Sequence, residues 1–157
     1  MRFLLDTHAA VWAISQSSLI PPGVREALNN PLAEVFVSSV TIFEIATKHK
    51  LNRRDSPPFG GTDAIGYFLD LGFQFLAVTP QHAATVDLLP LYHRDPFDRL
   101  LVAQARLEPM HLVSRDALIA LYDNLLWTAI FTIREERIRI ISVRRSRHEE
   151  EQGYHQC

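Results

Sequence analysis

The chain has 157 residues, of which 47% are hydrophobic and 22% charged. These values exclude a disordered or fibrous protein and indicate one compact domain with room for a small appendage. The net charge of −2 does not indicate strong attraction to nucleic acid, although it is compatible with a polyanionic substrate. The single cysteine, Cys157, excludes a disulfide framework within the chain, so we expect a reducing, cytoplasmic environment. No apolar run approaches the ~20 residues that span a bilayer, and we expect no membrane partner.

The first half of the chain predicts short strands followed by helices. Pro21-Pro22 breaks the chain between two early helices, and Ser38 or Ser39 can cap a helix that contains Glu44. In chain order, we expect a strand over residues 2–6, helices over 8–14 and 24–28, a strand over 35–37, a helix to about residue 50 and a loop over 53–61.

The second half repeats this alternation. Thr79-Pro80 and Asp95-Pro96 each combine an N-cap residue with a proline at the first helical position. In chain order, we expect a helix over residues 64–71, a strand over 73–78, helices from 80 to near 90 and from 96 to 108, a strand over 111–113, a helix over 117–122 and a strand over 125–127. This order predicts an α/β fold of three α/β/α layers, with a mostly parallel sheet covered on both faces.

Four acidic residues fall where such a sheet carries its ligand site, at the carboxyl ends of the strands. Asp6 follows the first strand, Glu44 lies one turn into a helix, Asp98 lies in the first turn of another, and Asp116 follows the strand over 111–113. Converging carboxylates raise one another's pKa, and a divalent cation relieves this conflict. Hard oxygen ligands favour Mg²⁺ or Mn²⁺, which can activate water against a phosphodiester.

Each acid also has an ordinary structural interpretation. Asp6 and Asp116 can cap the helices that follow them, Asp98 can favour its helix dipole, and Glu44 can face solvent. Asp95 already fills the cap position before Asp98. From spacing alone these alternatives stay open, because many α/β proteins carry acids at strand ends.

Several other side chains near the acids have two interpretations. His93, Arg99 and Arg115 neighbour proposed metal ligands and can contact RNA, or they can be structural, with Arg115 pairing with a carboxylate. Trp12 is expected in the core or in a groove that a protein partner occupies. An aspartyl phosphotransferase that uses Asp6 as its nucleophile is a rival enzyme class.

Four segments resemble VapC-type toxins of the PIN-domain family in the order of that family. They are FLLDTHAAVW (3–12), VSSVTIFEIATKHKL (37–51), LPLYHRDPFDRLLVAQA (89–105) and HLVSRDALIALY (111–122). The resemblance covers residues 1–127, which we take as one ribonuclease domain.

This resemblance implies a PIN fold and the toxin of a type II toxin–antitoxin system. The activity would be that of an Mg²⁺- or Mn²⁺-dependent endoribonuclease, acting on structured RNA of the transfer or ribosomal class. The resemblance places Asp6, Glu44, Asp98 and Asp116 in the catalytic and metal-binding positions, and it lets Thr7 hydrogen-bond a metal ligand or water. A cognate antitoxin would occlude the site, and we expect a homodimer. The alternative is an inactive toxin relic or fusion that acts only through antitoxin binding or oligomerisation.

Residues 128–157 depart from that family. The segment TAIFTIREERIRIISVRRSRHEEEQGY (128–154) resembles the carboxyl-terminal part of BrnT-type toxins. We expect a β-β-α appendage with strands over 130–133 and 138–143, too small for a core of its own. Arg139 and Arg144 can face RNA, or they can lie on a solvated face of the hairpin.

Overall fold

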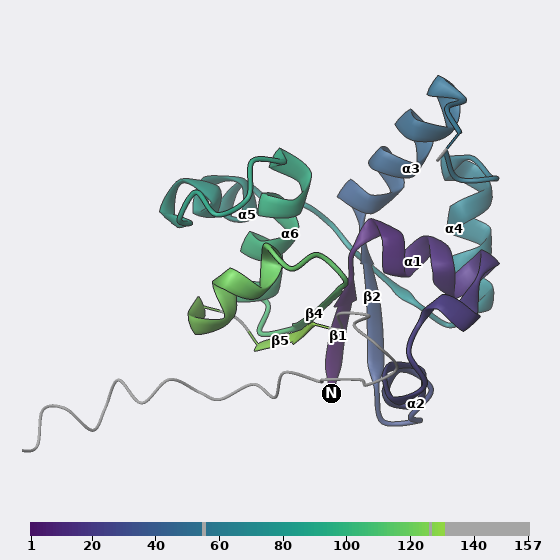
Figure 1. Cartoon of the computed structure of the whole chain (residues 1–157), viewed down its shortest axis with the longest axis horizontal. Coiled ribbons are helices and arrows are strands. Elements are labelled where there is room, and N and C mark those ends of the chain that lie inside the picture. Colours follow the sequence, from purple (N-terminus) through teal and green to yellow (C-terminus); the bar gives the residue numbers. More distant parts are fainter. Residues whose placement is uncertain (55, 126, 131–157) are drawn as a thin grey trace, which may run out of the picture.

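The centre of the molecule is a sheet of five parallel strands. The computed structural model describes residues 1–54, 56–125 and 127–130. Among them, the strands lie in the order β3-β2-β1-β4-β5, with every neighbouring pair parallel (Figure 1). The strands are β1 (Arg2–Leu5), β2 (Glu34–Ser38), β3 (Gln74–Leu76), β4 (His111–Ser114) and β5 (Trp127–Ile130).

Strand β1 lies in the middle of the sheet, and its apolar residues are buried on both faces. Leu4 pairs in register with Phe36 of β2 and with Leu112 of β4. Leu4 and Leu5 are both fully buried, although successive side chains of a strand point to opposite faces. A strand that is apolar on both faces is stable only between two helical layers.

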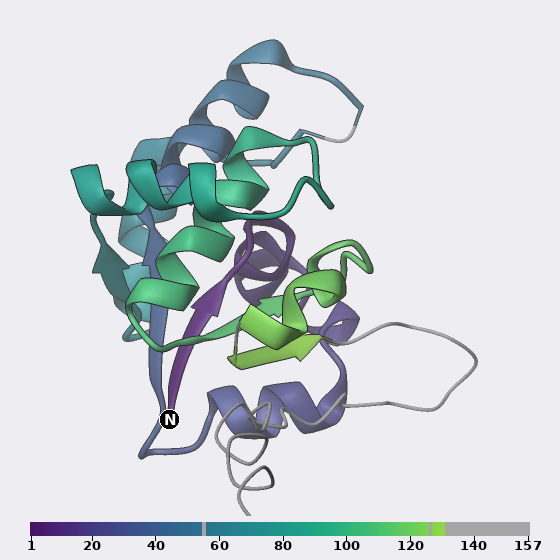
Figure 2. The same cartoon turned by 90° about the vertical axis from the view of Figure 1, so that its left-hand side faces the viewer.

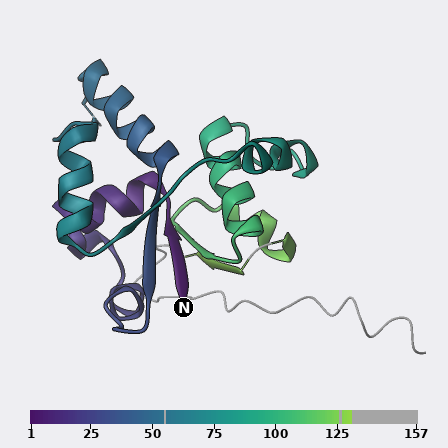
Figure 3. The same cartoon turned by 180° about the vertical axis from the view of Figure 1, so that it is seen from behind.

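Helices cover both faces of this sheet. They are α1 (Thr7–Ser15), α2 (Pro22–Leu28), α3 (Ser39–Leu51), α4 (Gly61–Asp70), α5 (Pro80–Thr85) and α6 (Pro96–Leu107), with 3-10 turns at Ser17–Leu19, Val86–Leu88 and Ile119–Leu125. Figure 1 shows α1, α3 and α4 on one side of the strands and α5 and α6 on the other. The view from behind in Figure 3 shows the same separation, so the expected α/β/α arrangement is confirmed.

Two apolar clusters hold these layers together, one on each face of the sheet. In the first, Phe3 and Leu5 pack with Phe68 of α4. In the second, Leu4 packs with Leu101 of α6 and with Tyr122. Seen from the side of α5 and α6, the second layer lies in front of the strands (Figure 2). Together the clusters fix the strand ends against the amino ends of α1, α3 and α6.

Side-chain caps begin the helices near the carboxyl edge of the sheet. Asp6 accepts a hydrogen bond from the Ala9 amide, and Ser38 accepts one from the Val40 amide. Thr79 and Asp95 cap α5 and α6 as the sequence predicted. Each cap satisfies an amide that the first helical turn leaves without a partner.

Several predicted elements differ from the structure. The helix from residue 80 ends at Thr85 rather than near 90, because main-chain carbonyls beyond it accept hydrogen bonds from Arg99 instead of continuing the helix. The segment predicted as a helix over 117–122 is the 3-10 turn Ile119–Leu125, and β3 is confined to Gln74–Leu76.

The last described strand crosses the predicted limit of the first domain. Strand β5 begins at Trp127 and ends at Ile130, so it lies later in the chain than the strand predicted over 125–127, and residues 128–130 belong to the sheet. The rest of the predicted β-β-α appendage lies outside the described residues. Within the described part of the chain, no helix has both the length and the apolar character of a membrane span.

Candidate metal centre

Asp6 joins the ends of two neighbouring strands. It follows β1, and one carboxylate oxygen accepts the Ala9 amide at 2.7 Å. The other oxygen accepts the hydroxyl of Ser114, at the end of β4, at 2.5 Å. The side chain is almost completely buried. Burial raises the pKa of Asp6, the bonds from Ala9 and Ser114 oppose that rise, and the charge of Glu44 adds to it.

Glu44, on α3, lies near enough to Asp6 and Asp98 for its charge to raise the pKa of both. Thr7 donates its hydroxyl to one oxygen of Glu44 at 2.5 Å, and the ammonium of Lys48 lies 2.6 Å from the other oxygen. Lys48 is one helical turn beyond Glu44, which is the spacing that brings two helical side chains together. The expected hydrogen bond from Thr7 to a proposed metal ligand is therefore present.

His93 connects the other two acids. Its Nε2 lies 3.0 Å from Asp116 and 3.4 Å from Asp98. Its Nδ1 accepts the Asp95 amide at 3.1 Å, so in a neutral ring the hydrogen is on Nε2 and points at the two carboxylates. The sequence indicated His93 as an RNA contact or a structural residue, and not as a partner of two of the acids. The available signal was its place five residues before Asp98, next to the Asp95 cap of α6.

The charges of Asp6 and Glu44 act on the pKa of Asp98. Burial raises the pKa of Asp98 to about 7; the neighbouring His93 works against this rise, and the charges of Asp95, Asp6 and Glu44 add to it. The carboxylates from β1, α3 and α6 therefore face a common region, although they lie far apart in the sequence.

The pKa of Asp116 is shifted in the opposite direction, below its ordinary value. Burial acts to raise its pKa, but the Leu118 amide, which donates to it at 2.7 Å, and His93 outweigh burial and leave the pKa below its usual range. The backbone amide of Asp116 itself donates to Ser114. Ser114 thus contacts both Asp6 and Asp116, a connection across more than 100 residues that the sequence did not predict.

This donor set suits a hard divalent cation. Within the described part of the chain, the ligand atoms of His93, Asp98 and Asp116 all lie within 4.8 Å of one another. Asp6 and Glu44 are not members of this group; their oxygens are engaged by Ser114 and by Thr7 and Lys48. Carboxylate oxygens favour Mg²⁺ or Mn²⁺, whereas a zinc site would be richer in His or Cys.

Arg99 and Arg115, both expected to contact RNA, differ in their surroundings. The prediction for Arg99 is wrong. Its side chain is buried, and its guanidinium donates to the carbonyls of Pro90, Val86 and Leu89. Arg115 is exposed, and its guanidinium lies 5.0 Å above the ring of Trp12. Arg139 and Arg144 lie outside the described residues.

The fold and the site together define an α/β/α domain that carries a carboxylate cluster at the carboxyl edge of a parallel sheet. The chain belongs to the PIN domain family, whose sequence profile matches residues 3–125. PIN domains are generally nucleases. A comparison with curated proteins found no match.

Solved structures share the fold at low sequence identity. One is VapBC2 from Rickettsia felis bound to a DNA fragment from its promoter, with a TM-score of 0.60, 15% identity, and coverage of 82% of this chain and 97% of that one. DNA-bound VapBC from Salmonella typhimurium has a TM-score of 0.58 and 16% identity, and covers 82% and 96%. A domain of a functionally unknown protein from Methanocaldococcus jannaschii has a TM-score of 0.53 and 14% identity, and covers 88% and 96%.

Proposed function

We propose that this chain is the toxin of a type II toxin–antitoxin system and that it hydrolyses RNA phosphodiester bonds with Mg²⁺ or Mn²⁺. The observation that carries the proposal is geometric: within the described part of the chain, the ligand atoms of His93, Asp98 and Asp116 lie within 4.8 Å of one another. Burial, with smaller contributions from the charges of Asp95, Asp6 and Glu44, raises the pKa of Asp98 to about 7, and a bound divalent cation favours the charged form of such a carboxyl. The four segments that resemble VapC-type toxins support the same activity.

The residues take separate roles in this proposal. Asp6 and Asp98 hold the principal ion, and Glu44, oriented by Thr7, completes its shell or positions a water. Asp116, oriented by His93, supports a second ion. When bound, the cation supplies a water of lowered pKa and neutralises charge on the phosphodiester.

RNA cleavage with and without Mn²⁺ tests the activity. We expect cleavage of transfer or ribosomal RNA by the full chain in Mn²⁺ and its loss in EDTA. Asp6→Asn should lower the rate by about ten-fold or more, because the variant keeps the capping oxygen but loses the charge. Cleavage that persists in EDTA and in Asp6→Asn contradicts a metal mechanism. A folded chain that cleaves no RNA in Mn²⁺ favours the alternative of an inactive relic that only binds a partner.

The pH dependence of metal binding follows from Asp98. With a pKa of about 7, roughly one tenth of the Asp98 side chains are ionised at pH 6 and nine tenths at pH 8. The cation must displace the proton, so its affinity should fall about ten-fold at pH 6, a loss of about 1.4 kcal/mol of stabilisation. Thermal unfolding with saturating Mn²⁺ should show a rise in Tm that is about 3–6 °C larger at pH 8 than at pH 6. Equal rises at both pH values contradict the role of Asp98.

An antitoxin partner and a homodimer complete the proposal. Large apolar side chains are exposed around the start of α6 and on α3, among them Leu91 and Phe43, and Phe43 contacts Phe97 beside Asp98. Exposed apolar side chains that gather near a site favour a protein partner. The resemblance of residues 128–154 to BrnT-type toxins, with RNA contacts by Arg139 and Arg144, stays a prediction. Size-exclusion chromatography of the full chain tests the dimer.

A further inference from the structure

A groove of about 230 Å³ lies between α1 and the loop that follows α3. The α1 side is formed by residues on one face of that helix, and the opposite side by Lys48 and the loop. The lining residues that matter here are Thr7, His8, Trp12, Lys48 and Arg54. Neither the metal ligands nor the family match assigns a role to this groove.

The groove begins where the carboxylate cluster ends. Thr7 and Lys48 both line it, and both contact Glu44, at 2.5 and 2.6 Å. An RNA strand with a phosphodiester at the carboxylates therefore reaches the groove with its next nucleotide. This position next to the carboxylates distinguishes the groove from an ordinary hollow on the surface.

The chemistry of the lining suits a nucleotide. Arg54 brings positive charge, Lys48 brings an ammonium that also pairs with Glu44 at 2.6 Å, and Trp12 brings an aromatic surface. The guanidinium of Arg115 lies 5.0 Å above the indole of Trp12, and the ring of His8 lies 6.2 Å from it. These contacts hold the indole in place. Cations beside an aromatic platform are the features that bind single-stranded nucleic acid, with a base stacked on the ring.

The size of the groove limits its occupant. Its volume of about 230 Å³ lies below the ~300–1,000 Å³ of pockets that enclose a whole ligand. One unpaired nucleotide fits this description better than a duplex, whose bases are not free to stack on a side chain.

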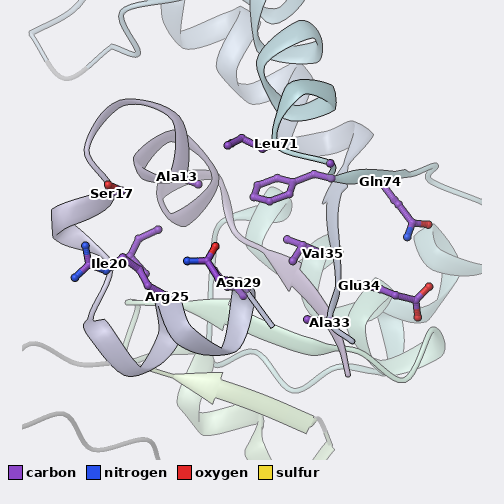
Figure 4. A pocket seen from close by; sticks show the side chains of 13 residues that line it. Ala13, Ser17, Ile20, Arg25, Asn29, Ala33, Glu34, Val35, Leu71 and Gln74 are labelled. Carbon is purple, nitrogen blue, oxygen red and sulfur yellow. The ribbon is translucent and has the colours of Figure 1, made fainter. Parts of the chain in front are cut away.

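A second hollow provides a contrast and a control. It has a volume of about 370 Å³ and lies at the amino ends of β2 and β3, away from the carboxylates. Figure 4 shows its charged residues, Arg25 and Glu34, on opposite sides of the view. Their charges are of opposite sign, so this hollow does not favour a polyanion.

We propose that the groove between α1 and the loop after α3 binds one unpaired nucleotide next to the scissile phosphodiester. The base stacks on Trp12, and the flanking phosphate lies between Lys48 and Arg54. The inference rests on the proposed ribonuclease function and deepens it, because it makes an unpaired nucleotide beside the cleaved bond a requirement of the substrate.

Tryptophan fluorescence tests the subsite without cleavage. The full chain is titrated with short single-stranded oligoribonucleotides, and with a duplex of the same sequence, in Ca²⁺ in place of Mn²⁺. We expect the single strand to quench the fluorescence and the duplex to leave it unchanged. Trp12→Phe should remove the quenching but keep the affinity, since phenylalanine still stacks. Trp12→Leu should weaken binding by about five-fold or more, measured by fluorescence anisotropy of a labelled RNA.

A matched pair of variants separates the groove from general charge effects. Arg54→Gln should raise the Kd about three- to ten-fold, whereas Arg25→Gln, with the same change of charge at the other hollow, should leave it unchanged. Equal effects of the two variants overturn the proposal, as does unchanged binding by a folded Trp12→Leu protein. Normal quenching without cleavage in Mn²⁺ contradicts only the proposed activity, and cleavage without quenching contradicts only the subsite.

Discussion

Asp98→Asn should lower the rate of RNA cleavage by about 100- to 1000-fold. Asp98 is the carboxylate on which the charges of Asp6, Glu44 and His93 all act. Its replacement by a neutral amide removes a proposed metal ligand, and the loss of one preorganised charged group costs about this factor in other active sites. Cleavage is measured with a labelled RNA in Mn²⁺ at pH 8.

The same substitution should stabilise the folded protein in the absence of metal. The pKa of Asp98 is about 7 in the folded protein and near 4 in an unfolded chain. Between these values the folded protein holds a proton that the unfolded chain has released, so stability falls as pH rises and the loss is complete above about pH 7. After allowance for partial solvent exposure, the gain for Asp98→Asn at pH 8 is about 1–2 kcal/mol, or a few degrees in Tm.

Asp95→Asn is the matched control for this prediction. Asp95 is three residues away and caps α6 through the Phe97 amide at 2.8 Å, and asparagine caps a helix about as well. Its cleavage rate should stay near that of the wild type. An equal loss of activity in Asp95→Asn and Asp98→Asn, or a lower Tm for Asp98→Asn in EDTA at pH 8, contradicts the assignment of the metal site to Asp98.

The sequence predicted those features that depend on local patterns. The first strand, which the structure ends at Leu5, the cap predicted at Ser38 or Ser39, which is Ser38, and the Asp95-Pro96 start of α6 follow from propensity and capping within a few residues. The position of the acids at the carboxyl edge follows from strand alternation alone. Helix and strand ends were predicted less well, because side chains from distant parts of the chain decide them.

The contacts that orient the acids depend on such distant side chains. Ser114 reaches Asp6 across 108 residues, and His93 reaches Asp116 across 23. Neither pair has a sequence spacing that indicates contact before the fold is known. The burial of Arg99, in contrast, was predictable, because Val102 and Ala103 lie three and four residues later on the same buried face of α6.

Arg99→Met should lower the free energy of unfolding by about 3–5 kcal/mol. One nitrogen of the guanidinium donates to the Pro90 carbonyl at 2.8 Å, and the other donates to the Val86 carbonyl at 2.8 Å. Methionine fills similar space but leaves carbonyls without donors, and each buried acceptor that loses its partner costs about 1–3 kcal/mol. Arg99→Lys should also destabilise the fold, since one ammonium cannot replace the planar fork.

The effect of Arg99→Met should extend to the candidate metal centre, because Arg99 also holds the segment that carries His93. Its guanidinium lies 3.4 Å from the Tyr122 hydroxyl, which accepts the His93 amide and donates to the Pro90 carbonyl. Without this anchor His93 no longer contacts Asp116, and the pKa of Asp116 rises toward its ordinary value. Denaturant unfolding measures the stability, and Arg106→Met, an exposed arginine in the last turn of α6, is the control. If the two variants unfold at the same denaturant concentration, Arg99 does not hold this segment, and the shape of the site must come from the caps and the sheet alone.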